Sequence, residues 1–155
     1  PTSNAMPTRA RLQAALGASA DDIEAAFYDA LQNGDLAQLM ACWADDDDVL
    51  CIHPGGPRLV GVEAIRASYE DLLSNGGLAV RPERVQRIEG LGGCVHGVIE
   101  RIEFMGPEGP QRAFVIATHV FHKTAQGWRL VLHHASAGPV VGERVATAVA
   151  PSRLH

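Results

Sequence analysis

Apolar positions recur at helical spacing in the first half of the chain and in long extended runs in the second half. The segment from Ser19 to Gly34 places its apolar residues on one face, with Ser19 positioned to cap the first turn and Gly34 to end the helix. Two further segments repeat this one-faced pattern and stop at glycine-containing or polar sequence. The pattern predicts helices near residues 20–33, 36–43 and 62–74.

After Gly77 the pattern changes to long segments separated by glycine-containing turns, which is typical of antiparallel strands. We expect strands that begin near residues 48, 78, 93, 112 and 128. In the segment from residue 112 to 124, Phe114 and Ile116 lie on one face and Phe121 on the other, so neither face is suited to water. The chain is therefore expected to be an α+β protein whose helices cover one face of the sheet and whose partner subunit covers the other.

This exposed face leads us to expect a homodimer. The predicted interface includes Phe114, Ile116 and either His122 or His134, because the two histidines share the face that points away from the helices. Hydrogen bonding at that interface is the simplest role for the outward histidine.

The patterned sequence extends over residues 19–139, which is enough for one domain with one core. Ser-Asn-Ala directly before Met6 resembles the remnant of a cleaved expression tag, so we interpret residues 1–5 as a scar and residues 6–18 as an N-terminal extension. Residues 140–155 have no clear periodicity and are expected to form a tail.

Composition excludes several classes of partner. The formal net charge of −5 and the scattered basic residues offer no face for nucleic acid, and no apolar run reaches the roughly 18 residues of a membrane span. The three cysteines, Cys42, Cys51 and Cys94, have no metal-ligand spacing, and no secretory signal precedes them. We expect a cytoplasmic protein that binds neither nucleic acid nor a membrane, with the three thiols in the core.

The clearest candidate for chemistry is His53. It ends a short run of strand-forming residues, and Pro54 with the following glycines must turn the chain sharply behind it. A histidine at such a corner can face a cavity, where its charge state is sensitive to small environmental changes. A hydrogen-bonded histidine in a turn is the structural alternative.

The order of these features resembles the nuclear transport factor 2-like superfamily, in particular its SnoaL-like and ketosteroid isomerase-like members. Helices come first, a strand ends in Ile-His-Pro, Leu-Val-Gly precedes the third helix, and the last strands contain TxVFHK, GW and HHAS. The segment from Thr118 to Ser136 is also similar to the association domain of calcium/calmodulin-dependent protein kinase II. The resemblance implies a cystatin-like cone, in which a strongly curved, mixed or antiparallel sheet wraps around the N-terminal helices and an apolar pocket, often in homodimers packed sheet to sheet.

Carried over to this sequence, the resemblance implies an altered site. The general-base aspartate of the isomerases falls at His53, their oxyanion-hole tyrosine at Phe27, and their protonated aspartate at His119. The pocket arginines of the kinase association domain fall at Glu100, His119 and Ala135. Neither steroid isomerisation by the family's mechanism nor carboxylate binding by arginines is therefore expected.

Counting along the last hairpin identifies a second pocket histidine. A three-residue loop over residues 125–127 would pair Thr124 with Trp128 and would set His119 opposite His133. A slip of one residue would destroy this pairing. A structural pair of hydrogen-bonded histidines is an equally good interpretation of His119 and His133.

We expect His53, His119 and His133 to be the catalytic residues, because neutral imidazole can take up and return a proton near pH 7. The related dehydratases of the superfamily use histidine in such a pocket. The expected substrate-binding residues are Phe27, Trp43, Tyr69, Glu100 and Phe121. Two alternatives stay open here: a salt bridge of Glu100 to an arginine such as Arg129, and a zinc site made by the three histidines.

The sequence thus predicts a pocket for an apolar small molecule, without metal or cofactor. The enzyme interpretation is an isomerase, dehydratase or cyclase that acts on an apolar carbonyl compound by histidine acid/base chemistry. The alternative is a non-catalytic ligand-binding or oligomerisation module, and fold analogy alone separates the two.

Overall fold

The computed structural model describes residues 19–138. The predicted scar and N-terminal extension and the whole of the predicted C-terminal tail lie outside the described residues. The elements in chain order are α2 (Ala20–Asn33), α3 (Leu36–Ala41), β1 (Leu50–Ile52), β2 (Arg58–Val60), α4 (Val62–Leu72), β3 (Val80–Glu89), β4 (Gly93–Gly106), β5 (Gly109–Thr124) and β6 (Gly127–Ala137).

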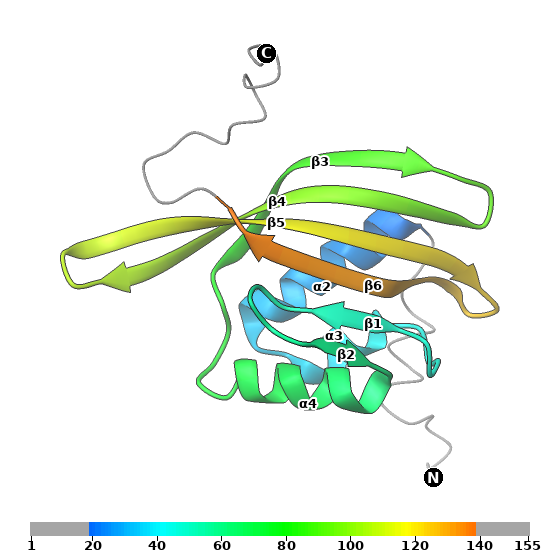
Figure 1. The fold of residues 1–155 in the computed structure, drawn as a ribbon, viewed down its shortest axis with the longest axis horizontal. Helices are drawn as coiled ribbons and strands as arrows, with labels where there is room; N and C mark the ends of the chain where they lie inside the picture. The colour runs from blue at the N-terminus through cyan, green and yellow to red at the C-terminus, as the bar shows by residue number, and fades with distance from the viewer. Residues whose placement is uncertain (1–18, 139–155) are drawn as a thin grey trace, which may run out of the picture.

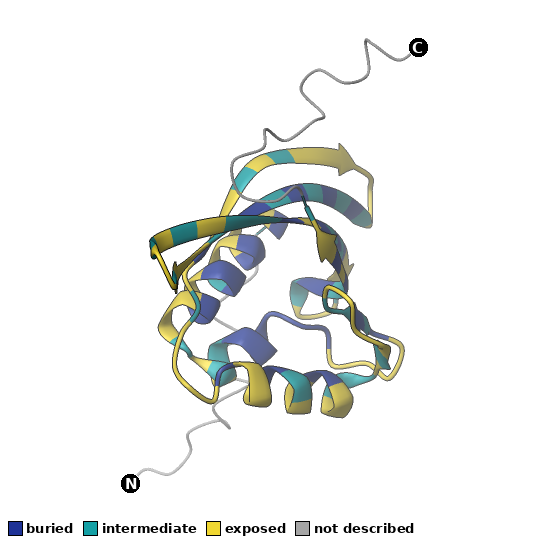
Figure 2. Cartoon of the chain, turned by 60° about the vertical axis from the view of Figure 1, so that its left-hand side comes forward, coloured by how far each residue is buried: buried dark blue, intermediate teal, exposed yellow. Residues whose placement is uncertain are grey.

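One curved sheet organises these elements. Its strand order is β2-β1-β6-β5-β4-β3, with β1 parallel to β6 and every other neighbouring pair antiparallel. Helix α2 crosses the concave face, while α4 lies beside β2 at the lower edge (Figure 1). Figure 2 shows that the buried sides of the helices and of the central strands face each other across the interior. The expected α+β cone with a mixed sheet wrapped around helices is confirmed.

Local signals account for helix α2. The Ser19 side chain accepts a hydrogen bond from the Asp22 backbone at 3.1 Å, and Gly34 ends the helix in the left-handed conformation at φ 66°. The face that packs on the sheet carries the fully or almost fully buried residues Ile23, Phe27 and Leu31. Burial of that apolar stripe, rather than propensity alone, holds the helix in place. Within residues 19–138, no helix is long and apolar enough to cross a membrane.

In the last hairpin the predicted loop length is wrong, but the predicted pairing of His119 with His133 is observed. Thr124 pairs with Gly127, not with Trp128, so the loop between the paired positions has two residues instead of three. A bulge then leaves Val131 without a partner, because Phe121 pairs with Leu130 and the preceding residue of β5 pairs with the residue after Val131. The one-residue error in the loop is thus cancelled, and His119 does lie opposite His133.

Other boundaries differ by a few residues. Strand β2 was not predicted, because it is a three-residue edge strand directly after a proline-glycine turn and carries too little pattern to recognise. Strand β5 begins at Gly109, earlier than predicted, and with β4 it forms a long hairpin that projects beyond the rest of the sheet (Figure 1). The three cysteines are buried thiols, as expected.

The connection into β3 gives a test of packing. A side chain at Gly77 would clash with the carbonyl oxygen of Gln32, because the chain passes directly over the end of α2. We expect Gly77→Ala to lower the free energy of unfolding by roughly 1–3 kcal/mol through overpacking. Gly92→Ala, at an exposed turn with open space around it, should change stability by less than about 0.5 kcal/mol. Urea denaturation of both variants measures the difference, and equal stabilities would contradict the packing account.

Candidate active site

A cavity of about 260 Å³ opens between the concave face of the sheet and the helices. Helices α2 and α4, the turn after β1, and strands β4, β5 and β6 all contribute to its wall. Most lining side chains are apolar; the polar ones are His53, Tyr69, Glu100 and His133. Small-molecule sites typically combine such an apolar wall with a few placed polar groups.

His53 is held at the cavity by the serine below it. Its Nε2 lies 3.0 Å from Ser68 Oγ, and the Ser68 hydroxyl donates its own hydrogen to the carbonyl oxygen of Ile65. Because that hydroxyl has one hydrogen, Ser68 must accept from His53, which places the proton on Nε2 and leaves Nδ1 with a lone pair. Burial lowers the pKa of His53 below its ordinary 6.5, so the ring is neutral at pH 7.

A thiol stands next to this histidine. Cys51 Sγ lies 3.7 Å from His53 Nε2 and 3.8 Å from Tyr69 Oη. Burial raises the pKa of Cys51 to about 12, although the contact with Tyr69 opposes the shift. Only the thiolate is a good nucleophile, so the pair is unsuited to covalent catalysis.

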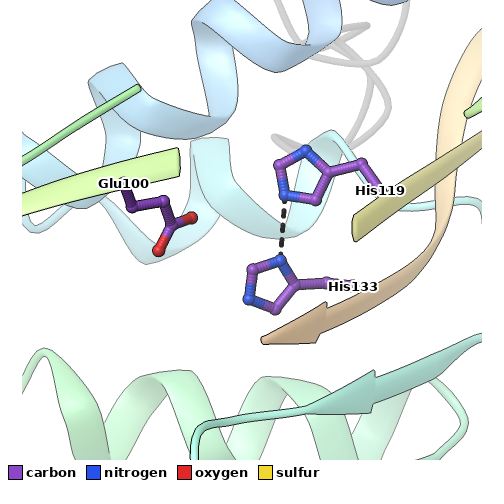
Figure 3. A group of neighbouring side chains, drawn as sticks. All are labelled: Glu100, His119 and His133. Carbon is purple, nitrogen blue, oxygen red and sulfur yellow. Dashed lines mark hydrogen bonds between the residues drawn. The ribbon is translucent and has the colours of Figure 1, made fainter. Parts of the chain in front are cut away.

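His133 belongs to a relay of buried groups that runs behind the cavity. Glu24 Oε2 lies 2.8 Å from His119 Nδ1, and His119 Nε2 lies 2.9 Å from His133 Nδ1. Figure 3 shows this contact between the two rings, with the other nitrogen of His133 directed away from His119. The strand pairing of β5 with β6 sets the two histidines opposite each other, and α2 supplies the carboxylate.

The relay determines which nitrogen of each ring carries a proton. Burial raises the pKa of Glu24, but hydrogen bonds and charge from His119 and His96 outweigh it, so the pKa lies below its ordinary 4.5. An ionised Glu24 accepts a hydrogen bond from His119 Nδ1. In the neutral form of His119, Nε2 then has a lone pair and accepts a hydrogen bond from His133 Nδ1. His133 is left with a lone pair on Nε2. Burial, and then the nearby histidines, hold the pKa of His133 well below 6.5.

Glu24 and His96 were not among the predicted site residues. His96 is buried, and its Nδ1 lies 3.0 Å from Glu24 Oε2 in a geometry that fits an ion pair better than a directed hydrogen bond. Its Nε2 lies 3.8 Å from Asp21 Oδ1, which also pairs with Arg87 at 2.9 Å. The sequence did carry a signal, because Glu24 falls on the apolar stripe of α2, where a carboxylate needs buried partners.

Glu100 faces the relay from β4. It accepts a hydrogen bond of 2.6 Å from Tyr28 Oη, so its partner is a tyrosine rather than the arginine that the sequence suggested. Burial raises the pKa of Glu100, while the Tyr28 bond and the charge of His119 lower it by less. Burial and the neighbouring Glu100 also raise the pKa of Tyr28 well above 10, which keeps the phenol protonated as the donor.

The structure divides the predicted site residues into two groups. Those that line the cavity are His53, His133, Phe27, Tyr69 and Glu100. The others are buried and are not among the residues that line the cavity: His119, Trp43 and Phe121. His119 contacts His133 and Phe27, which line it, and the Phe121 ring packs edge-on against His119 and at a tilt against His96. His53 and His133 therefore face each other, with ring centres 6.2 Å apart.

These lowered pKa values predict a pH-dependent stability. The unfolded chain takes up protons on histidine near pH 6.5, whereas the folded chain resists protonation of His133 and His53 until a lower pH, so folding stability should fall as the pH drops below about 6.5. We expect the loss in unfolding free energy between about pH 7.5 and about pH 5.5 to be smaller in His133→Gln. Urea denaturation at both pH values measures it, with the exposed His122→Gln as control. An equal loss in wild type and His133→Gln would contradict the assignment.

Comparison with known proteins identifies the family. A family model for the SnoaL-like domain matches residues 21–140. Among solved structures, a candidate association domain of calcium/calmodulin-dependent protein kinase type II from Thiobacillus denitrificans is 34% identical, with a TM-score of 0.72 over 80% of this chain and 98% of that chain. A candidate dehydratase of the NTF2-like family from Streptomyces avermitilis is 29% identical, with a TM-score of 0.66 over 74% and 90% of the two chains.

More distant matches support the fold alone. A ketosteroid isomerase-like protein from Erwinia carotovora is 17% identical, with a TM-score of 0.61 over 76% of this chain and 92% of that chain. A search of curated proteins finds no match. The family model covers most of the sequence and all of the elements around the cavity, and the protein therefore belongs to the SnoaL-like domain family.

Proposed function

We propose that this protein is an isomerase or lyase that acts by histidine acid/base chemistry on a small, largely apolar carbonyl compound. His53 is the base, and its Nδ1 receives the proton. The observation that carries the proposal is the pair of neutral histidines on facing parts of one apolar cavity, each fixed in one tautomer by its own hydrogen bonds. A positioned base near neutrality is what general-base catalysis requires.

His133 provides the second position for a proton. Its Nε2 lone pair can receive or return a proton, and the Glu24–His119 pair behind it orients the ring and stabilises the cation that forms. In this scheme His133 acts on the substrate, while His119 and Glu24 are positioning residues. An isomerase or dehydratase needs such a base because it moves a proton between carbons or removes water without any change in oxidation state.

The cavity limits the substrate. Its volume of about 260 Å³ lies below the roughly 300–1,000 Å³ of pockets for drug-sized ligands, which favours a small compound over a steroid. The walls formed by Phe27, Leu31 and Val115 favour an apolar body, and the polar groups among the lining residues favour a carbonyl or hydroxyl. Enones and hydroxy ketones fit this description and are the compounds to screen.

A variant of His53 tests the assignment once a compound is turned over. We expect His53→Ala to reduce turnover by at least about a hundredfold, because general-base assistance is typically worth that much or more. His122→Ala, which removes an exposed histidine from the outer face of β5, should retain activity. Circular dichroism and thermal melting check that both variants fold. Undiminished turnover in folded His53→Ala would remove His53 from the mechanism.

A second function, as an oligomerisation module, is favoured by the outer face of the sheet. The face of β4, β5 and β6 that points away from the helices carries an apolar patch, which the paired residues Gly97, Thr118 and His134 cross: Val95, Ile99, Phe114, Ile116, Val120 and Leu132. Ile116 is 43% exposed, which is unusual for the centre of a sheet. The similarity to a candidate kinase association domain points the same way. We propose that this patch forms a homodimer whose interface includes His122 or His134.

A charge in the patch tests the dimer. Ile116→Glu should weaken self-association by at least about tenfold, because the carboxylate would be buried without a partner. Leu91→Glu introduces the same charge at a fully exposed leucine in the turn between β3 and β4, outside the patch, and should leave the dimer intact. Sedimentation equilibrium at micromolar concentration distinguishes the two. A wild-type protein that sediments as a monomer would contradict the proposed dimer.

A further inference from the structure

Three metal-binding side chains converge at the inner end of the cavity. Glu100, His119 and His133 each offer one ligand atom, and these atoms lie within 4.8 Å of one another. All three side chains are buried, and Glu100 and His133 line the cavity. Figure 3 shows how the three side chains lie relative to one another. Two histidines and one carboxylate form the ligand set of several catalytic zinc and non-haem iron sites, which keep further positions open for water or substrate.

Each of two ligands is oriented by a second group behind it. Glu24 accepts from His119 Nδ1, which directs the Nε2 lone pair toward His133. Tyr28 donates to Glu100 Oε2, which leaves Oε1 as the oxygen that can turn toward an ion. A carboxylate that holds the far side of a histidine, and a hydrogen bond that holds a ligating carboxylate, are the partners that metal ligands need.

The distances fit an ion in place of a proton. His119 Nε2 and His133 Nδ1 lie 2.9 Å apart and share one hydrogen. Two nitrogens bound to one tetrahedral zinc ion lie roughly 3.3 Å apart, so a small opening of this contact would admit the metal. The displaced proton has a place to go, because His133 can carry it on Nε2 instead.

A second cluster of possible metal ligands in the described residues is unsuitable for binding a metal ion. Asp21, Glu24 and His96 also lie within ligand distance of one another. There, however, the Arg87 side chain already pairs with Asp21 Oδ1 at 2.9 Å, which puts a cation where the metal would have to bind. That cluster also has no contact with the cavity.

We propose that Glu100, His119 and His133 bind one divalent first-row transition-metal ion, such as Zn²⁺, at the wall of the cavity. The sequence suggested zinc on three histidines; the geometry replaces His53 with Glu100. With the ion bound, His133 is a ligand instead of the second proton position, and His53 stays across the cavity, free to act as the base. The inference deepens the proposed function and rests on it only for the reaction, because binding of the ion can be measured without any substrate.

The ion would supply the electrophile. The two histidines that line the cavity each present a lone pair, so neither polarises a carbonyl by donating a hydrogen bond. The ion held by Glu100, His119 and His133 would supply a Lewis acid for the carbonyl oxygen while His53 Nδ1 takes a proton from the adjacent carbon, whose C–H electron pair forms the new double bond. Return of the proton to the far carbon of an unsaturated carbonyl compound would complete an isomerisation with no oxidant or reductant.

Cobalt provides a direct readout. Untagged, chelator-treated full-length protein should bind about one Co²⁺ per chain by elemental analysis and show visible d–d bands of four- or five-coordinate cobalt, and Zn²⁺ should abolish these bands by competition. Glu24→Gln should weaken binding about ten- to a hundredfold, as expected for a group that orients a ligand, and Glu100→Gln should weaken it further.

Two controls separate this inference from the proposed function. His53→Ala should bind Co²⁺ like the wild type while losing turnover, and His96→Gln should also bind it. Absence of stoichiometric cobalt in the wild type, equal binding by folded Glu100→Gln, or loss of binding in His96→Gln would overturn the metal site. Turnover that depends on His53 in protein shown to be metal-free would overturn it as well, while leaving the proposed function standing.

Discussion

One buried carboxylate, Glu24, determines how the interior of this protein is protonated. A charge in an apolar interior is costly unless it is paired, and Glu24 is paired twice, with His119 at 2.8 Å and with His96 at 3.0 Å. The pairing fixes the proton on His119 Nδ1, and this in turn fixes the tautomer of His133 at the cavity wall. The chemistry of a strand-borne histidine on β6 is therefore set from a helix more than a hundred residues away in the chain.

Much of the fold could be predicted from periodicity, and the exceptions have physical causes. The stripe on α2 and the cap residues Ser19 and Gly34 identify the helix with its ends, because both signals are local. Strand β2 has three residues and almost no burial, so its place at the sheet edge depends on pairing with β1 instead of on its own pattern. The bulge at Val131 depends on how two strands coil around each other, which no single segment encodes.

Only some of the site residues could be predicted from the sequence, for a related reason. His53 could be found because Pro54 marks a corner, and His133 because strand pairing can be counted. Alternation along a strand predicts which face of the sheet a histidine occupies. It does not predict whether that side chain borders the cavity or is separated from it by another ring. His119 and His133 alternate identically with their neighbours, yet only the latter reaches the cavity. The carboxylate that orients them lies on another element, and its place on the apolar stripe of α2 indicates buried partners without identifying which residues they are.

The unpaired Val131 has a consequence for how the site can change in evolution. If the register of the turn ran on along β6 without this bulge, every following residue would shift by one position and turn to the opposite face, so that Leu132 would pair with His119, His134 would enter the interior and His133 would leave it. The catalytic potential of the cavity is thus conditional on one extra residue in β6 that is not among the residues lining the cavity, and relatives that pair these strands without the bulge would present a different side chain there.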